Sequence, residues 1–301
     1  MSLLYALQQL MNAVQVTAIY ALLSVAFVLF YGVTNRLNLA FGAIAMWAAY
    51  VTILMISLLE GVTFWPLLLV VMAGMGIALA NSALLGFSLH HLALRHLVNR
   101  RPQAMLIATV AIAITLEEIM RLINSSRELW QRPFFSDPIR LIESQSFPIQ
   151  VTPLQIAAVL VAFCVVGLLI MLVKWNRFGI YWRACSEDLP MAALCGVNIP
   201  LILAASFILA SLCAALAGSL IAMLYGSASF VMGTVIGLKT MFIAVIGGLR
   251  SLSGAVLASA LLALFETYWS AYLDLAYRDV AAFCILTLVL VLKPEGMRAR
   301  T

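Results

Sequence analysis

The chain has 301 residues, of which 65% are hydrophobic and only 10% charged, and its mean hydropathy is +1.10. Soluble domains are about half apolar and about 25% charged, so this composition excludes them. The net charge of +5 would suggest acidic partners in a soluble protein, but here it mainly reflects Lys and Arg in cytoplasmic loops. Apolar runs long enough to cross a bilayer as helices recur along the chain, whereas a membrane β-barrel would show short alternating segments. We therefore predict an all-α integral membrane protein.

Hydropathy predicts a polytopic helical bundle of about eight to nine spans. Segments 38–59 and 229–248 are rich in glycine and small polar residues, which is typical of broken or re-entrant helices buried within a protein. Residues 1–20 contain no Lys or Arg, so we expect no signal peptide. We expect a single transmembrane domain over 1–301, with candidate spans at about 12–33, 38–59, 66–90, 104–124, 152–173, 199–224, 229–248, 252–273 and 278–292.

The positions of Lys and Arg predict the orientation of the bundle, because these residues concentrate in cytoplasmic loops. The rule places three segments in the cytoplasm. The three assignments are consistent with one another, because an even number of predicted spans separates each pair of segments. The N-terminus then lies outside, and Arg36 and Arg250 lie at cytoplasmic junctions. The three segments and their charges are 91–103 with Arg95, Arg100 and Arg101, 174–198 with Lys174, Arg177 and Arg183, and the tail with Lys293, Arg298 and Arg300.

The largest external segment is 125–151, which mixes charged and aromatic residues. One interpretation is a solvated loop with a few aromatic residues at the membrane interface. The other is a docking surface for an external partner, since aromatic residues and Arg are common in binding hot spots. The residues are Arg127, Arg132, Arg140, Glu128, Asp137, Glu143, Trp130, Phe134 and Phe135.

The segment RACSEDLPMAALCGVNIP, residues 183–200, predicts a short helix in the second cytoplasmic loop. Ser186 or Asp188 can cap it, and Asp188 is the better cap because Pro190 then falls in the first turn. Gly196 stands where a left-handed residue ends a helix. This helix is too short to be stable alone and lacks the basic face of a lipid-bound helix, so we expect it to dock in a protein groove.

The same region resembles the permeases of branched-chain amino acid ABC importers, of the LivH type. The matching residues are R-x-G and R-A-x-x-E-D-x-x-M-A-x-x-x-G-V-N within 177–198, G-L-K and A-V-x-G-G-x-x-S within 237–251, Glu266, R-D at 278–279 and K-P-x-G at 293–296. The resemblance also covers 20–51. Where the family usually has N-F-A-H-G, this chain has N-L-A-F-G at 38–42, and S-L-S-G at 251–254 replaces S-I-P-G.

The resemblance implies one permease subunit of an importer in the bacterial inner membrane. Its partners would be two cytoplasmic ATPases, a second permease such as a LivM-like paralogue, and a periplasmic binding protein. The cargo would be branched-chain amino acids, or amides, urea or aromatic acids as in related subfamilies. We expect no cofactor in this chain, with ATP bound by the partner subunits. The residues expected to couple to the ATPase are Arg183, Glu187, Asp188, Met191, Ala192, Ala193 and Gly196.

Five residues are predicted to line the translocation pathway: Asn35, Asn38, Gly42, Lys239 and Glu266. Lys239 lies in mid-span, where a charge faces a cavity or has a partner. A structural ion pair with Glu266 is the alternative to a pathway role. Elsewhere, Glu118 and Arg121 can pair along one helix face. The small residues Ala214, Ala215, Ala217 and Gly218 are expected to allow close helix packing.

No catalytic or metal motif occurs in the sequence. A phosphate-binding loop needs Gly-Lys, which is absent, and His90, His91 and His96 do not form H-E-x-x-H. We interpret these histidines as interfacial and all five cysteines as packing residues. Two alternatives to the importer are a stand-alone secondary carrier or channel and a structural membrane subunit, but neither explains the acid-capped cytoplasmic helix.

Overall fold

The computed structural model describes residues 3–62, 66–94, 97, 102–132, 134, 137–142 and 149–292. Several residues singled out above lie outside these ranges: Arg95, His96, Arg100, Arg101, Phe135, Glu143, Lys293, Arg298 and Arg300. The long helices are α1 (Leu3–Thr34), α2 (Ala40–Val62), α3 (Leu67–Leu89), α5 (Pro102–Ile123), α6 (Pro153–Trp175), α9 (Ile199–Tyr225), α10 (Met232–Gly247), α11 (Leu252–Tyr272) and α12 (Arg278–Leu292).

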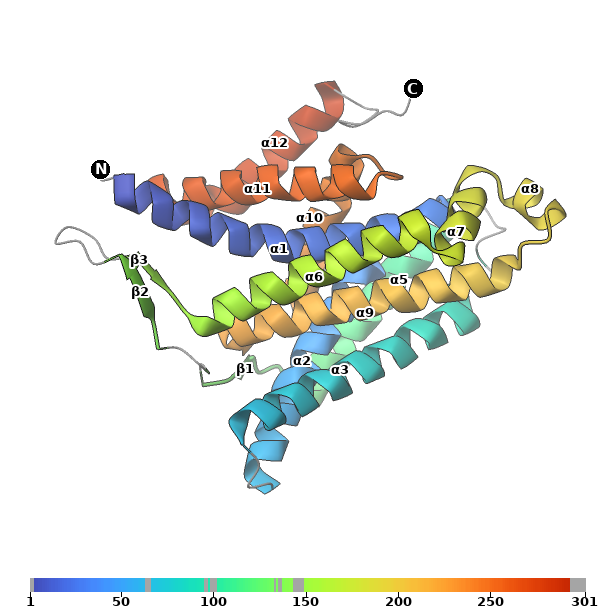
Figure 1. The fold of residues 1–301 in the computed structure, drawn as a ribbon. Coiled ribbons are helices and arrows are strands. Elements are labelled where there is room, and N and C mark those ends of the chain that lie inside the picture. Colours follow the sequence, from blue (N-terminus) through green and yellow to red (C-terminus); the bar gives the residue numbers. More distant parts are fainter. Residues whose placement is uncertain are drawn as a thin grey trace.

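Each of the nine predicted spans coincides with one of these helices (Figure 1). Among the described helices, six are long and apolar enough to cross a membrane: α1, α2, α3, α6, α9 and α11. Helix α10 is shorter, at 16 residues. The predicted all-α polytopic membrane fold is confirmed.

The irregular backbone expected in the two glycine-rich segments lies beside the helices rather than within them. Helix α2 runs without interruption from Ala40, and the non-helical stretch is residues 35–39, which precede it. Helix α10 likewise begins only at Met232, after the short strand β4 (Ser227–Ala228). The irregular backbone therefore lies at the start of each predicted segment, and in the first of them it includes Asn35 and Asn38.

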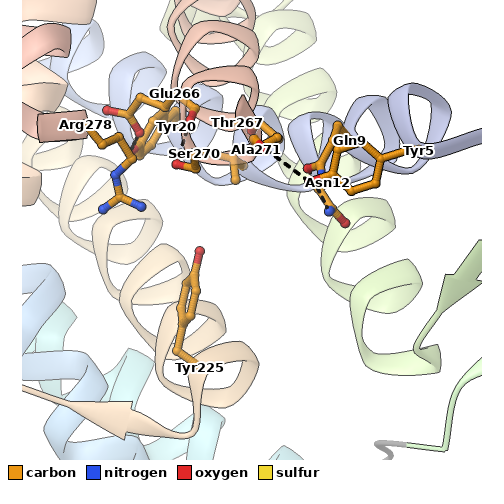
Figure 2. A pocket seen from close by; sticks show the side chains of 11 residues that line it. Tyr5, Gln9, Asn12, Tyr20, Tyr225, Glu266, Thr267, Ser270, Ala271 and Arg278 are labelled. Carbon is orange, nitrogen blue, oxygen red and sulfur yellow. Dashed lines mark hydrogen bonds between the residues drawn. The ribbon is translucent and has the colours of Figure 1, made fainter. Parts of the chain in front are cut away.

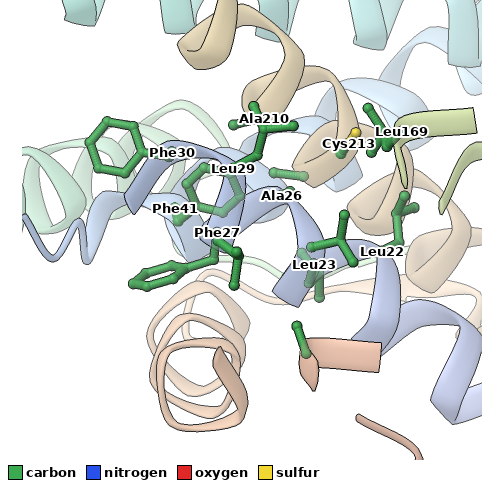
Figure 3. Close-up of a cluster of buried hydrophobic side chains, with 14 of the residues drawn as sticks. Leu22, Leu23, Ala26, Phe27, Leu29, Phe30, Phe41, Leu169, Ala210 and Cys213 are labelled. Atoms are coloured by element: carbon green, nitrogen blue, oxygen red, sulfur yellow. The ribbon is translucent and has the colours of Figure 1, made fainter. Parts of the chain in front are cut away.

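Helix α1 forms the centre of the bundle. It packs against α6, α9, α10 and α11, and every residue from Ala21 to Phe30 is buried. In its most apolar stretch 78% of the residues are buried, against 28% in α3 and α6, which present apolar faces to the bilayer. Figure 3 shows Phe27 and Phe30 of α1 beside Phe41 of α2 and Ala210 of α9. A helix that is apolar on all sides is stable here because protein surrounds it.

Short strands organise the side of the bundle that the charge rule predicts to be external. Strand β1 (Leu129–Trp130) pairs with β4, and β2 (Ile139–Ile142) pairs with β3 (Ile149–Val151). The side-chain amide of Gln8 accepts from the Gln150 N–H at 3.1 Å and donates to the Gln150 carbonyl at 2.9 Å. Segment 125–151 is thus tied through β3 to α1 and through β1 to the connection between α9 and α10.

Two further contacts join segments that the charge rule places together. Arg250 donates to the Asn35 Oδ1 at 2.9 Å, which links the two junctions predicted to be cytoplasmic. The β1–β4 pair links two junctions predicted to be external. Glu118 and Arg121 form the predicted ion pair on α5.

The histidine and cysteine interpretations hold only in part. His90, in the π-helical turn η1 (His90–Leu94), is buried, and its ring lies 5.4 Å from that of Phe207. Cys185 and Cys213 are buried, as expected of packing residues. Cys164, Cys195 and Cys284 are exposed, so the packing interpretation is wrong for them.

Small residues do allow close helix packing. Gly218 of α9 lies directly against the backbone of Ala45 in α2, so an added Cβ would collide with the Ala45 carbonyl oxygen. Ala214, Ala215 and Ala217 on the same helix are also buried. This crossing is one of the most extensive contacts of α2.

We predict that Gly218→Ala lowers the free energy of unfolding by about 1–3 kcal/mol, as over-packing generally does. Gly167→Ala on α6 is the matched control, because a Cβ there meets nothing within 4 Å. Thermal unfolding of both purified variants in detergent, monitored by size-exclusion chromatography, measures the effect. Equal stability of the two variants would contradict the close crossing.

Candidate functional site

The predicted coupling helix is present as α8 (Leu189–Leu194). Asp188 caps it, since its carboxylate accepts from the Met191 N–H at 3.2 Å. Gly196 has a φ of +82°, and the N–H groups of Gly196 and Val197 donate to the carbonyls of Ala193 and Ala192. These are the two hydrogen bonds of a Schellman motif, so both ends of α8 are defined by local sequence.

The outer surface of α8 is apolar and exposed. Met191 is 62% exposed and Leu194 83% exposed, and α8 projects from one end of the bundle (Figure 1). Ala192 is only 3% exposed and packs in the main core. Ala192 therefore lies on the buried side of α8, and its expected role in coupling to an ATPase stays a prediction. The exposed side of this segment contains Leu194 and, with it, Glu187, Asp188, Met191, Ala193 and Gly196.

Helix α7 (Arg177–Glu187) braces α8 against the bundle. Arg183 donates to the carbonyls of Val173 at 2.6 Å and Lys174 at 3.3 Å, at the C-terminal end of α6. The Trp182 indole donates to the Leu29 carbonyl of α1 at 2.8 Å and packs on Gly32. Arg183 therefore holds α7 in place rather than standing on the outer surface, and Trp182 is a contact that the sequence analysis missed.

The stretch from Asn35 to Gly42 crosses the bundle beside α10. Asn35 bonds to Arg250 just after the end of α10, whereas Gly42 contacts Gly233 and Gly237 in its first turns. The chain between them runs opposite to α10. Non-helical backbone at membrane depth must be buried in protein or line a wet cavity.

Asn38 supports this irregular stretch. Its Oδ1 accepts from the Ala40 N–H at 2.9 Å, which caps α2, while the Leu39 N–H donates to the Thr109 hydroxyl of α5 at 3.4 Å. Asn38 is 1% exposed, and its Nδ2 has no partner in the described part of the chain. A buried amide donor of this kind is available for a water or a passing solute.

Lys239 and Glu266 are brought together, as predicted, in a larger network. The ammonium of Lys239 lies 2.8 Å from Glu266 Oε1 and 2.9 Å from Asp279 Oδ1. The Tyr20 hydroxyl donates to Glu266 Oε2 at 2.7 Å. Lys239 and Glu266 are each at most 5% exposed. Four helices, α1, α10, α11 and α12, thus meet at these charges.

The network also borders open space. Glu266 and Tyr20 line a cavity of about 300 Å³ (Figure 2), and Lys239, Tyr20 and Asp279 line an adjoining one of about 370 Å³. The two alternatives considered for Lys239 are therefore compatible. It forms a structural ion pair and also borders a cavity.

The five predicted pathway residues do not form one cluster. Gly233 and Gly237 face α2, whereas Lys239 faces α1, α11 and α12. Residues 237 and 239 are about 200° apart around a helix, so α10 lies between the two groups. Asn35, Asn38 and Gly42 occupy one side of α10, and Lys239 and Glu266 the other.

Comparisons with known proteins identify the family. The family model described as branched-chain amino acid transport system permease component matches residues 9–292. The chain belongs to this permease family. It is 32% identical over 300 residues to the high-affinity branched-chain amino acid transport system permease protein LivH of Escherichia coli K12, covering 99% of this chain and 96% of LivH.

Two other relatives agree. The permease protein BraD of Pseudomonas aeruginosa is 30% identical over 98% of this chain and 96% of its own length. A probable branched-chain amino acid transport permease of Methanocaldococcus jannaschii is 25% identical over 95% of this chain. No solved structure shows significant similarity. The chain is thus a multi-pass permease subunit rather than a catalytic subunit.

We predict that Lys239→Met destabilises this permease by about 3–5 kcal/mol, because the buried carboxylate of Glu266 loses its partner. The double variant Lys239→Met/Glu266→Gln should recover part of the loss, since no unpaired buried charge then remains. Thermal unfolding in detergent measures both. If the single variant were as stable as the parent, the ion pair would make no net contribution to folding.

Proposed function

We propose that this permease is one transmembrane subunit of an ATP-driven importer in the bacterial inner membrane. Its cargo would be branched-chain amino acids or related small polar solutes such as amides or urea. The supporting observation is α8, a capped helix that exposes Met191 and Leu194 at the end of a braced loop. The relatives' names, which specify a transport system permease for branched-chain amino acids, support the same proposal.

In this proposal, two cytoplasmic ATPases bind and hydrolyse ATP, and one of them receives α8 in a surface groove. The exposed apolar side chains of Met191 and Leu194 would be buried there, with the acidic residues Glu187 and Asp188 at the rim. Such an arrangement, an apolar centre within a polar rim, is typical of protein interfaces. The permease performs no bond-breaking step and requires no cofactor of its own.

A second permease, such as a LivM-like paralogue, would complete the membrane part, and a periplasmic binding protein would deliver the cargo. The external segment 125–151 offers a surface for the binding protein, since Trp130 is 74% exposed there. Because β1 pairs with β4 and Gln8 holds β3, a partner docked on this segment would contact residues bonded to α1 and to the connection between α9 and α10.

Motion of α8 would reach the bundle through α7. Trp182 and Arg183 attach α7 to α1 and α6, and α1 carries Tyr20, which bonds to the buried Glu266. A displacement of α8 therefore moves a helix that contributes to the ion network. A stand-alone carrier could also contain the buried charges, but it would leave the exposed apolar face of α8 unexplained.

Leu194→Glu is expected to abolish ATP-dependent uptake and ATPase co-purification, because a carboxylate would replace the most exposed apolar contact of α8. Leu194→Met is the matched control and should retain both. The measurement is uptake of radiolabelled leucine into proteoliposomes that contain the co-purified complex. Normal uptake by Leu194→Glu, with the ATPase still bound, would remove α8 as the docking element.

Cys195 provides a native probe of the same surface. Cys195 is exposed next to α8, whereas Cys185 is buried and burial raises the pKa of its thiol, so a membrane-impermeant maleimide should label Cys195 preferentially. Cys164 and Cys284 are also exposed but lie within α6 and α12, so the double variant Cys164→Ser/Cys284→Ser is used as the background. In this background labelling should fall when the ATPase is bound, and adding Cys195→Ser should abolish it. Unchanged labelling in the assembled complex would argue against a partner that covers this loop.

A further inference from the structure

The cavity of about 370 Å³ lies among the external ends of α1, α9, α10 and α12. It adjoins the cavity of about 300 Å³, and both are lined by Val16, Tyr20, Tyr225 and Arg278. Lys239 and Tyr20 lie at the inner end, and Ser229 and Val231 lie at the external junction between α9 and α10. The cavity therefore extends from the external side to the buried ion network.

Arg278 and Asp279 supply a cation and an anion to this cavity. Arg278 Nε donates to Asp279 Oδ1 at 3.2 Å, and Lys239 donates to the same oxygen. Within the described part of the chain, the two terminal nitrogens of Arg278 and the Oδ2 of Asp279 have no bonded partner. Their side chains are 38% and 43% exposed, so both groups remain accessible to a solute.

Tyr225 completes the polar part of the lining. Figure 2 shows its hydroxyl and the guanidinium of Arg278 pointing into the same space, and Tyr225 is 61% exposed. A hydroxyl donor beside a guanidinium is a suitable pair for a carboxylate, because charge-assisted hydrogen bonds are the stronger class.

The opposite part of the lining is apolar. It consists of Ile19, Ile221, Val231, Met232, Val235 and Ile236. The charges around the cavity balance, since Lys239 and Arg278 offset Glu266 and Asp279. A cavity with no net charge, one cation, one anion and an apolar wall matches a zwitterion that carries an aliphatic side chain.

We propose that this cavity is a binding site for an α-amino acid with an aliphatic side chain. Arg278 and Tyr225 bind its carboxylate, Asp279 Oδ2 binds its ammonium group, and the side chain lies against the apolar wall. The volume is within the range of small-molecule sites, about 300–1,000 Å³. This inference rests on the proposed function, because it assigns to the permease itself a site for the amino-acid type of cargo rather than for urea or amides.

The test is binding of tritiated L-leucine to the full-length chain in lipid nanodiscs, measured by scintillation proximity. We expect saturable binding that unlabelled L-isoleucine and L-valine displace. Leucinamide, which lacks the carboxylate, and 4-methylpentanoate, which lacks the ammonium group, should compete at least about tenfold more weakly, because each loses the charge-assisted hydrogen bonds to one end of the site, at Arg278 or at Asp279. L-Lysine and L-glutamate should compete as weakly, because their charged ends meet the apolar wall.

Three variants locate the site. Arg278→Gln and Asp279→Asn should each weaken leucine binding at least about tenfold, and Arg121→Gln, which breaks the surface pair on α5, should leave it unchanged. The competition experiments with the unlabelled ligands use the unmodified chain. They therefore still test the proposal if Arg278→Gln or Asp279→Asn folds poorly. The proposal would be overturned if leucine showed no saturable binding, or if 4-methylpentanoate displaced it as strongly as unlabelled leucine does. It would also be overturned if a lipid were found in the cavity.

The result is separable from that of the proposed function. A complex that imports leucine with ATP although the isolated permease binds none would refute this site and leave the importer standing. Leucine binding by a chain that neither co-purifies with an ATPase nor imports with ATP would refute the importer and leave the site standing.

Discussion

The buried ammonium of Lys239 is the interaction on which the arrangement of the helices depends. An unpaired charge inside a membrane protein costs several kcal/mol, so α11 and α12 must bring carboxylates to α10. Glu266 and Asp279 do so at 2.8 and 2.9 Å, and Tyr20 of α1 completes the shell around Glu266. Helix α1 and the three consecutive helices α10, α11 and α12 are thereby held at one point, and none of the four can move relative to the others without disturbing a charge.

Local sequence predicts local structure well in this chain. Asp188, Pro190 and Gly196 define α8, because caps and left-handed residues act within a few positions. Which side of α8 faces outward could not be predicted, since Ala192 is buried only because α7 and α9 pack there. For the same reason Leu194 was missed.

Contacts between residues far apart in the sequence were predicted only where a buried group has few possible partners. The pair Lys239–Glu266 followed from the cost of a buried charge, but Asp279 was missed because it lies at a helix start, where a carboxylate needs no buried partner. The irregular stretch before α2 lies at residues 35–39, at the start of the predicted segment. Glycine composition indicates that a break occurs, but its exact place depends on Gly42 meeting Gly233 and Gly237.

Helix α10 connects the two polar regions that the sequence analysis had treated as one pathway. Its glycine face rests on α2, where a residue without a side chain allows close contact, while its other face carries Lys239. The glycines of α10 contact α2 only through van der Waals packing, whereas Lys239 binds Glu266 and Asp279 through directional ion pairs. A shift of α10 together with α1, α11 and α12 would therefore keep the ion pairs and slide along the glycine contacts with α2, which changes the space around Asn38 without opening the ion network. Asn38 stands in the irregular stretch 35–39, and the packing of this stretch therefore depends on where α10 rests against α2.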